Sequence, residues 1–224
     1  MTVDIFSDIR CPFCYVGKKK FENALDKFAK RDDIKVVWHS YQLDPYLQTQ
    51  PDRDPYDFFS ESKGINLQQA KMMHEHAKNA GKEAGIEFNF DNQKIANSYR
   101  GHLLIQLAKQ KGIANEMEEE LFKAQFIDAR NIDDENELIS IGKNAGLTED
   151  EVKNALNSDE LKNKIAEDSL LARKIGVRAV PFFVFNDKYA VSGAQSPEVF
   201  LEVLEKSYEE FSAGSRGLNL IASL

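Results

Sequence analysis

The sequence predicts an α/β fold in which a small sheet, built from the two ends of the chain, carries a large inserted domain that is entirely helical. Two observations support this prediction. Strand-like segments are confined to the ends of the 224-residue chain, and the long stretch between them has helical periodicity. We therefore expect a discontinuous α/β domain of residues 1–45 and 176–224, and an inserted α-helical domain of residues 46–175.

The first part of the α/β domain has the pattern of a β-α-β unit. Residues 2–6 and 34–41 favour strands, the second because it is rich in β-branched and aromatic residues. Between them, apolar residues recur every three to five positions from Pro12 to Lys30, which indicates a helix. A unit of this length predicts two parallel strands joined by a right-handed crossover.

The inserted domain begins with a proline-rich loop and continues as a series of helices. Glycines follow the periodic runs where helices commonly end, and Thr148 with Glu151 has the pattern of a capping box. The expected helices cover residues 55–62, 67–84, 97–111, 115–127, 135–145, 149–156 and 159–175.

The last part of the chain predicts a hairpin followed by a helix. Residues 182–186 and 189–192 are strand-like and flank a tight turn. Ser196 and Pro197 have the pattern of a helix start, and we expect this helix to end near Phe211. The sequence assigns no role to the tail that follows.

Composition and charge argue against several classes of function. Lys and Arg total 29 and Asp and Glu total 37, so the net charge of −8 argues against nucleic acid or an anionic membrane as partner. No stretch approaches the roughly 20 apolar residues of a membrane span. Asp4 stands where a signal peptide requires basic residues, so we expect a cytoplasmic protein.

Both cysteines lie in the segment Cys11-Pro12-Phe13-Cys14, at the start of the first predicted helix. Proline at the first helical position places Cys11 at the helix N-terminus, where unpaired N–H groups and the helix dipole stabilise a thiolate. The neighbouring Arg10 adds positive charge. Cys14, one turn further on, is expected to be more buried and less ionised. The arrangement is typical of a redox pair with an attacking and a resolving sulfur.

Two other interpretations of the cysteine pair carry less weight. A zinc site needs two more ligands, but the chain has no third cysteine, and its four histidines form no spaced pair that fits a second half-site. We therefore expect no metal and no resident cofactor. Two inert buried thiols are also compatible with the composition. The Cys-Pro-x-Cys arrangement within a β-α-β unit nevertheless favours redox chemistry.

A second feature, far along the chain, supports the redox interpretation. Pro181 precedes the strand at 182–186, and because proline cannot donate to a strand ladder, it must face an edge or have special geometry. A cis Val180–Pro181 bond is one explanation. A trans proline at the start of an edge strand is the other.

Taken together, these features resemble the DsbA family of thioredoxin-fold proteins, and more narrowly its FrnE-like cytoplasmic branch. The resemblance extends to the segments 38–45, 97–104, 120–132 and 180–195. It implies a thioredoxin-like fold with the helical domain over the active site, Cys11 as nucleophile and Cys14 as resolving thiol. Phe13 departs from the His of the DsbA dipeptide and from the Trp common in the FrnE-like branch, so the resemblance does not set the redox potential.

The resemblance also implies roles for residues outside the cysteine pair. Pro181 would be the cis-proline facing the cysteines, with the Val180 backbone pairing to an extended peptide substrate. Asn97 and His102 match a family motif in the insertion, and we expect them, with Arg10, to contact substrate. The alternatives are a helix cap for Asn97 and a buried structural role for His102.

Three functional hypotheses follow. The first is a thiol-disulfide oxidoreductase that acts on protein disulfides, dithiols or small thiols without a cofactor. The second is a glutathione-dependent enzyme, because the insertion and Ser192–Gln195 resemble kappa-class glutathione transferases and hydroxychromene-carboxylate isomerases; those proteins usually carry Ser at the position of Cys11. The third is a binding protein whose cysteines sense oxidants. Glutathione stays open as a co-substrate, and no oligomeric state is predicted.

Overall fold

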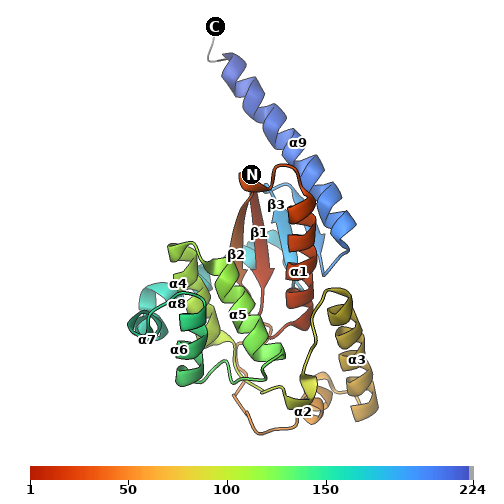
Figure 1. Cartoon of the computed structure of the whole chain (residues 1–224), viewed down its shortest axis with the longest axis vertical. Helices are drawn as coiled ribbons and strands as arrows, with labels where there is room; N and C mark the ends of the chain where they lie inside the picture. The colour runs from red at the N-terminus through yellow and green to blue at the C-terminus, as the bar shows by residue number, and fades with distance from the viewer. Residues whose placement is uncertain (222–224) are drawn as a thin grey trace.

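The computed structural model describes residues 1–221, with the side chains of residues 1–214, and contains a mixed sheet built from both ends of the chain (Figure 1). The strands are β1 (Thr2–Ser7), β2 (Lys35–Ser40), β3 (Phe182–Phe185) and β4 (Tyr189–Ser192). Their order is β2-β1-β3-β4. Strand β1 is parallel to β2 and antiparallel to β3, and β3 is antiparallel to β4. The predicted α/β fold class is therefore confirmed.

The helices agree with the predicted segments to within a few residues, except at the C-terminus. They are α1 (Pro12–Lys27), α2 (Pro55–Lys63), α3 (Leu67–Glu83), α4 (Tyr99–Lys111), α5 (Ala114–Phe126), α6 (Glu135–Asn144), α7 (Glu149–Asn157), α8 (Asp159–Ile175) and α9 (Pro197–Ile221). Short 3-10 turns lie at Arg31–Asp33 and Phe90–Asn92.

Helix α9 is longer than predicted, and the prediction that it ends near Phe211 is wrong. Glycines end helices in this protein where they adopt a positive φ, as Gly64 does after α2 and Gly176 after α8. Gly214 has no such backbone and lies inside α9, which continues to Ile221 and projects beyond the sheet (Figure 1). Residues 222–224 of the predicted tail lie outside the described residues.

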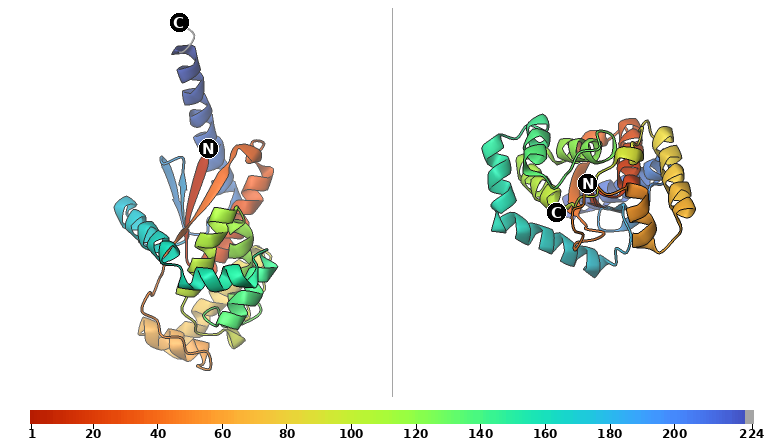
Figure 2. Two further views of the ribbon diagram at one scale, coloured as in Figure 1. Left: turned by 90° about the vertical axis from the view of Figure 1, so that its left-hand side faces the viewer. Right: turned by 90° about the horizontal axis from the view of Figure 1, so that it is seen from below.

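Helices cover both faces of the sheet (Figure 2). On one face, α1 and α9 pack through aromatic rings: Phe183 of β3 contacts Phe200 of α9 at a centroid distance of 4.6 Å and Phe21 of α1 at 5.6 Å. On the other face, Phe6 of β1 packs against Ala172 of α8 and Val177, which follows it. Helix α8 therefore joins the inserted helices to the sheet and leads directly into the segment before β3.

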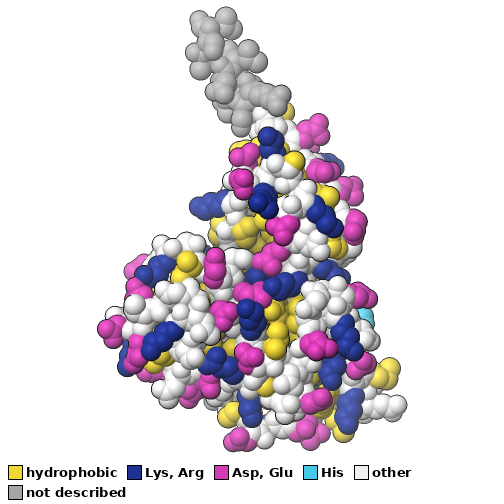
Figure 3. All heavy atoms as spheres, in the orientation of Figure 1, with side chains coloured by type: hydrophobic (Ala, Val, Ile, Leu, Met, Phe, Trp, Pro, Cys, Tyr) yellow, Lys and Arg dark blue, Asp and Glu magenta, His cyan; other side chains and the backbone are white. Residues whose placement is uncertain are grey.

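Charged side chains of both signs are interspersed over the visible face of the molecule, without a large area of one sign (Figure 3). On this face, the described side chains form no extended basic surface of the kind that binds nucleic acid. Within the described residues, no helix combines the length and the apolar character of a membrane span.

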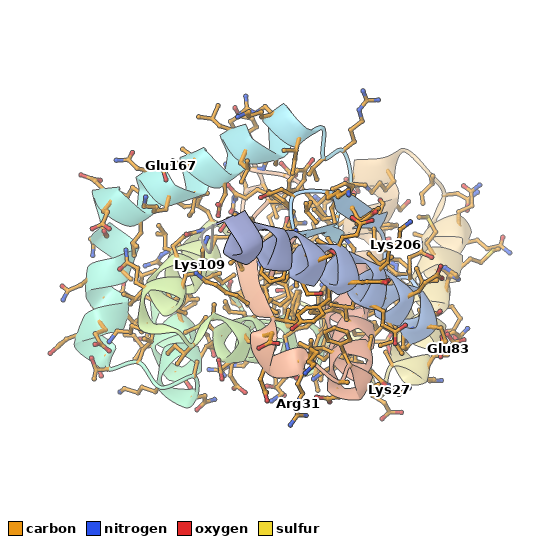
Figure 4. The ribbon with its side chains drawn as sticks, turned by 90° about the horizontal axis from the view of Figure 1, so that it is seen from above. Lys27, Arg31, Glu83, Lys109, Glu167 and Lys206 are labelled. Carbon is orange, nitrogen blue, oxygen red and sulfur yellow. The ribbon has the colours of Figure 1, made fainter. Side chains whose placement is uncertain are left out.

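A buried network of charged side chains links α8 and α4 to the sheet. His39 of β2 has both ring nitrogens against carboxylates: Nδ1 is 2.6 Å from Asp168 Oδ1, and Nε2 is 2.8 Å from Asp4 Oδ1. Asp168 Oδ2 accepts from the Ser40 N–H at 2.8 Å. Lys109, labelled in Figure 4, reaches from α4 to within 3.4 Å of the same oxygen.

In this network, the positive charge of His39 and the negative charge of Asp168 stabilise each other. Burial acts to lower the pKa of His39, but the hydrogen bonds that His39 donates to Asp168 and Asp4 outweigh it and raise the pKa. Burial acts to raise the pKa of Asp168, but His39, Lys109 and the Ser40 N–H lower it. Because a carboxylate only accepts hydrogen bonds, both nitrogens of His39 carry protons in this arrangement. An imidazolium therefore ties β2 to α8.

Candidate active site

The loop between β1 and α1 positions the two cysteines one helical turn apart. Cys11 is the N-cap of α1, with φ −94° and ψ 110°, and Pro12 occupies the first helical position. The Cys11 N–H donates to the Asp8 carbonyl oxygen at 2.9 Å, and the Cys14 N–H donates to the Cys11 carbonyl oxygen at 3.0 Å. The backbone thus places Cys11 at the positive end of the helix dipole.

The two cysteines differ in exposure. Both are free thiols; Cys11 is 7% exposed and Cys14 is 1% exposed. Burial is the main factor that raises the pKa of Cys14 well above that of a free thiol, and the adjacent Cys11 raises it further. Opposing this, the polar groups of Asp8 and Ser7 near Cys14 act to lower its pKa, but they do not outweigh burial. Of the two, Cys11 is therefore the sulfur nearer to solvent.

The segment before β3 lies beside Cys11. The Val180–Pro181 peptide bond is cis. The Cys11 thiol donates to the Val180 carbonyl oxygen with an Sγ–O distance of 3.5 Å. Residues separated by about 170 positions in the chain therefore meet at one sulfur atom.

Gly17 permits the close approach of α1 to Pro181. A Cβ atom at position 17 would lie 2.9 Å from Pro181 Cγ, closer than packed carbon atoms allow, and 3.4 Å from Phe183 Cζ, in ordinary contact. Glycine costs helix stability in a helix interior, so its presence here has a packing reason. The sequence analysis did not single out Gly17, although an isolated glycine inside a helical pattern is such a signal.

Aromatic side chains from the insertion surround the cysteines. The ring of Phe13 contacts that of His76 on α3 at a centroid distance of 5.8 Å. The cysteines share one apolar cluster with Tyr15 of α1 and with Phe88 and other residues of the insertion. The inserted helices therefore form one wall of the site.

A buried carboxylate holds the cysteine loop in place. Asp8 is fully buried; its Oδ1 accepts from the Arg10 N–H at 3.1 Å and its Oδ2 from the Leu43 N–H at 2.7 Å. His102 Nε2, from α4, lies 3.4 Å from Asp8 Oδ1. Burial acts to raise the pKa of Asp8, but His102 and the two N–H donors outweigh it and lower the pKa. Asp8 thus links the loop, the segment after β2 and the insertion.

A second buried acid, Glu118 of α5, lies among the same charges. It is 1% exposed, and its Oε2 has no hydrogen-bond partner in the described part of the chain. Burial raises the pKa of Glu118 to about 8, Lys18 counteracts this, and the charge of Asp8 adds to it. Glu118 is therefore largely a neutral acid at pH 7.

The residues predicted to contact substrate have other positions. His102 is fully buried against Asp8, so it does not face a cleft. Asn97 lies one position before Ser98, the N-cap of α4; it accepts from the Tyr99 N–H at 2.8 Å and donates to the Leu47 carbonyl oxygen at 2.9 Å, so it joins the start of α4 to the preceding loop. Arg10 is partly buried, beside Asp8 and Asp44. For Asn97 and His102, the structural alternatives fit the geometry better than a substrate contact.

Ser7 and Asp8 are the residues at the cysteines that the sequence analysis missed. Ser7 is the last residue of β1 and Asp8 is the first residue after it, and this place at the end of a strand was the available signal. Among the described side chains, no group of three His, Cys, Asp or Glu residues is placed to hold a metal ion. A surface hollow of about 620 Å³ between α2 and α3 lies elsewhere and contains neither cysteine.

The sheet, the helical insertion and the cysteine loop beside a cis-proline define a thioredoxin-fold protein of the DsbA type. The DSBA-like thioredoxin domain model matches residues 2–205, and the chain belongs to this family. The expected membership of the DsbA family is thereby confirmed.

Three relatives illustrate the match. A probable DsbA oxidoreductase of Streptomyces coelicolor, SCO1869, is 32% identical; the alignment covers 94% of this chain and 91% of that one, with a TM-score of 0.87. The uncharacterized protein YwbO of Bacillus subtilis (strain 168) is 27% identical over 206 residues, 88% of this chain and 92% of that protein. The Pseudomonas aeruginosa cytosolic disulfide reductase DsbM, solved with GSH, is similar in fold: 17% identity, coverage of 93% and 100%, and a TM-score of 0.67.

Proposed function

We propose that this protein is a thiol-disulfide oxidoreductase in which Cys11 attacks and Cys14 resolves. The observation that carries the proposal is the placement of Cys11 at the N-terminus of α1, beside the Val180 carbonyl, with Cys14 buried one turn behind it. Family membership supports the reaction class.

In the first step, the Cys11 thiolate attacks one sulfur of a substrate disulfide. A bond forms between Cys11 Sγ and that sulfur, the substrate S–S bond breaks, and the other sulfur leaves as a thiolate that takes up a proton. The helix N-terminus stabilises the attacking thiolate. Cys14 is too buried to make this attack on a protein substrate.

In the second step, Cys14 resolves the mixed disulfide. Cys14 loses its proton and attacks Cys11 Sγ; the Cys11–Cys14 bond forms and the substrate sulfur leaves, taking up a proton. Two electrons have then passed from the cysteine pair to the substrate. The same steps in reverse oxidise a dithiol. In a reducing cytosol, where we propose the protein acts, reduction or isomerisation is the expected net direction.

The Val180–Pro181 segment is proposed to hold the substrate chain. The Val180 carbonyl accepts from the Cys11 thiol, so a substrate sulfur bonded to Cys11 lies next to this backbone. An extended segment on either side of the substrate cysteine then pairs with the Val180 backbone by strand addition. Protein disulfides and dithiols are the proposed substrates.

Substitution of each cysteine tests the assignment of roles. Cys14→Ser is expected to accumulate a mixed disulfide with oxidised substrate such as insulin, visible on non-reducing gels and by intact mass, whereas Cys11→Ser accumulates none. The double variant is the control for non-specific capture. Equal trapping by both single variants, or no dithiol-dependent insulin reduction by the wild type, would contradict the proposal.

Glutathione is proposed as a small-thiol co-substrate, supported by the fold that this chain shares with the GSH-bound disulfide reductase. A glutathione-dependent transferase or isomerase remains the alternative, and it has no need of a resolving thiol. Cys14→Ser separates the two: it abolishes multiple turnover of a disulfide reductase, but leaves a transferase or isomerase active. Retention of both cysteines favours the reductase.

A further inference from the structure

Arg10 has a guanidinium group beside the attacking cysteine that no other side chain neutralises. Arg10 directly precedes Cys11 and is partly buried. In the described part of the chain, its guanidinium makes neither an ion pair nor a hydrogen bond. By contrast, Arg53, Arg100 and Arg130 each pair with a glutamate. A charged group that loses hydration without gaining a partner costs free energy, and an anionic ligand would recover it.

The backbone of Arg10, unlike its charged end, is held firmly. Its N–H donates to Asp8 Oδ1 at 3.1 Å, and the Cys11 N–H closes the turn by donating to the Asp8 carbonyl oxygen at 2.9 Å. Asp8 Oδ2 accepts in turn from the Leu43 N–H at 2.7 Å. The turn therefore fixes the point where the Arg10 side chain begins, one residue from the attacking sulfur. Such a preorganised group loses little entropy when it binds a ligand.

The two aspartates whose charges act on Arg10 do not neutralise it. The Asp8 carboxylate is fully buried and accepts backbone N–H groups, and Asp44 is exposed and accepts from the Tyr46 N–H at 3.2 Å. Burial lowers the pKa of Arg10, and the charges of Asp8 and Asp44 offset this only in part. Helix α1 has no acidic residue in its first turn. A guanidinium, which stays protonated at pH 7, therefore adds to the positive end of the helix dipole.

We propose that Arg10 binds a carboxylate that the substrate carries close to its reacting sulfur, so that the enzyme selects acidic peptidyl disulfides, glutathione disulfide foremost. This inference rests on the proposed oxidoreductase function and names its substrate class. Consecutive Cα atoms lie about 3.8 Å apart, so a group bonded to Cys11 Sγ is within reach of the long Arg10 side chain. The planar guanidinium can bind a carboxylate through two parallel hydrogen bonds.

The chemistry is the disulfide exchange described above, with glutathione disulfide as the oxidised partner. Cys11 Sγ bonds to one glutathione sulfur, the S–S bond of glutathione disulfide breaks, and the departing glutathione takes up a proton. Cys14 loses its proton and displaces the second glutathione, which also leaves as a thiol. The cysteine pair is then oxidised, and the disulfide is reduced to two glutathione molecules. Arg10 holds the half that stays on Cys11 and exchanges neither protons nor electrons.

Three small disulfides of different charge test the inference. Glutathione disulfide is anionic, 2-hydroxyethyl disulfide is neutral and cystamine is cationic. The full-length protein carries Cys14→Ser, so the first attack stops at the mixed disulfide, and acid quenching with intact mass gives its rate of formation. The neutral disulfide serves as the reference, because any change in the reactivity of Cys11 itself affects all three rates alike.

Arg10→Gln is expected to change the rates according to the charge of the disulfide. Relative to the neutral disulfide, the rate with glutathione disulfide is expected to fall by about 3- to 10-fold, and the rate with cystamine to rise. Arg10→Glu reverses the charge and is expected to enlarge both changes. If Arg10→Glu does not fold, Arg10→Ala replaces it as the second variant and is expected to match Arg10→Gln.

Arg31→Gln is the matched control. Arg31, labelled in Figure 4, is an exposed arginine beyond the C-terminal end of α1, whereas Arg10 precedes its N-terminal end. Its replacement removes the same charge from the protein and is expected to change neither relative rate. A charge effect that acts through the whole molecule would appear in both variants.

Peptide disulfides distinguish glutathione from an acidic residue of a protein as the source of the carboxylate. Two acetylated and amidated peptides with Glu or Gln after a single cysteine, each as its disulfide-linked dimer, are compared in the same assay. A faster, Arg10-dependent reaction of the Glu peptide shows that Arg10 also accepts a protein carboxylate. Equal rates for the two peptides, with the Arg10-dependent preference for glutathione disulfide retained, assign the subsite to glutathione.

Three outcomes overturn the inference: Arg10→Gln leaves the relative rates unchanged, slows all three small disulfides equally, or has the same effect as Arg31→Gln. In each of these cases the small disulfides still react with Cys11. If none of them forms a mixed disulfide in the Cys14→Ser protein, the proposed oxidoreductase function fails instead. The two failures are therefore distinguishable.

Discussion

Replacement of His39 by glutamine is expected to destabilise the contact between α8 and the sheet in a pH-dependent way. His39 is about 9% exposed, and its two nitrogens are hydrogen-bonded to Asp168 and Asp4. Glutamine has no charge and cannot donate to both carboxylates in this geometry. The variant therefore leaves one buried carboxylate, Asp168, without its imidazolium partner.

The size of the effect follows from what each carboxylate retains. Breaking a buried ion pair by removing one partner typically costs about 3 to 5 kcal/mol. Asp168 keeps its hydrogen bond from Ser40 and its contact with Lys109, and the Asp4 side chain is 21% exposed and can be hydrated. We therefore expect a loss near the lower end, about 3 kcal/mol in the free energy of unfolding.

The pH dependence has a definite sign. The pKa of His39 is raised above its ordinary value of 6.5, so the stabilisation is fully present below pH 6.5 and is lost as the pH rises through the folded-state pKa. The pKa of Asp168 is lowered below 3.8, so on the acid side the stabilisation is lost as the pH falls through that folded-state value. The wild type and His39→Gln therefore differ most between about pH 4 and 6.5 and least under alkaline conditions.

Urea unfolding followed by far-UV circular dichroism from pH 4 to pH 9 measures this difference. The double variant His39→Gln/Asp168→Asn is the control: because both members of the pair are gone, it is expected to be less destabilised than the sum of the single variants. A difference below about 0.5 kcal/mol at pH 6, or one that stays constant to pH 9, would refute the reasoning.

Two further predictions concern the site itself. Gly17→Ala places a Cβ against Pro181, so it is expected to destabilise the protein by about 1 to 3 kcal/mol and to slow insulin reduction. The control is Gly214→Ala, whose Cβ would lie in open space; thermal unfolding is expected to show it neutral or slightly stabilised. Folding raises the pKa of the buried Glu118 from 4.5 to about 8, so the folded state is destabilised wherever the unfolded state has an ionised carboxylate. Glu118→Gln removes this effect. It is expected to increase the free energy of unfolding at pH 7 by up to about 3 kcal/mol and to flatten its dependence on pH between pH 5 and 8. An unchanged profile would contradict the burial argument.

Structural features that depend on residues close together in the sequence were predictable from the sequence alone. Periodicity located the strands and most helices, and the spacing of Cys11 and Cys14 around Pro12 placed the pair at a helix start. The position of Pro181 before a strand pointed to unusual geometry, and its peptide bond is cis. In each case the physical cause lies within a few residues of its effect.

Features that depend on residues far apart in the chain were not predictable in this way. His39 was considered only as a metal ligand, because nothing near it in sequence reveals Asp168. Asp8 meets His102 and Leu43 through folding alone, so neither its burial nor its role in the loop has a local pattern. The substrate contact expected for His102 came from a family motif, which says that a residue recurs but not which way it faces.

These long-range contacts connect the inserted helices to the loop that carries the cysteines. Gly101 lets α4 approach the cysteine loop so closely that a Cβ there would lie 2.6 Å from Ile9 Cδ1, and the next residue, His102, pairs with Asp8. Helix α3 brings His76 against Phe13. The inserted helices therefore hold the loop that presents Cys11 as well as forming a wall beside it. Since the loop has partners in α4, we expect a substitution of His102 to shift the loop that carries Cys11 through Asp8, without any contact with substrate.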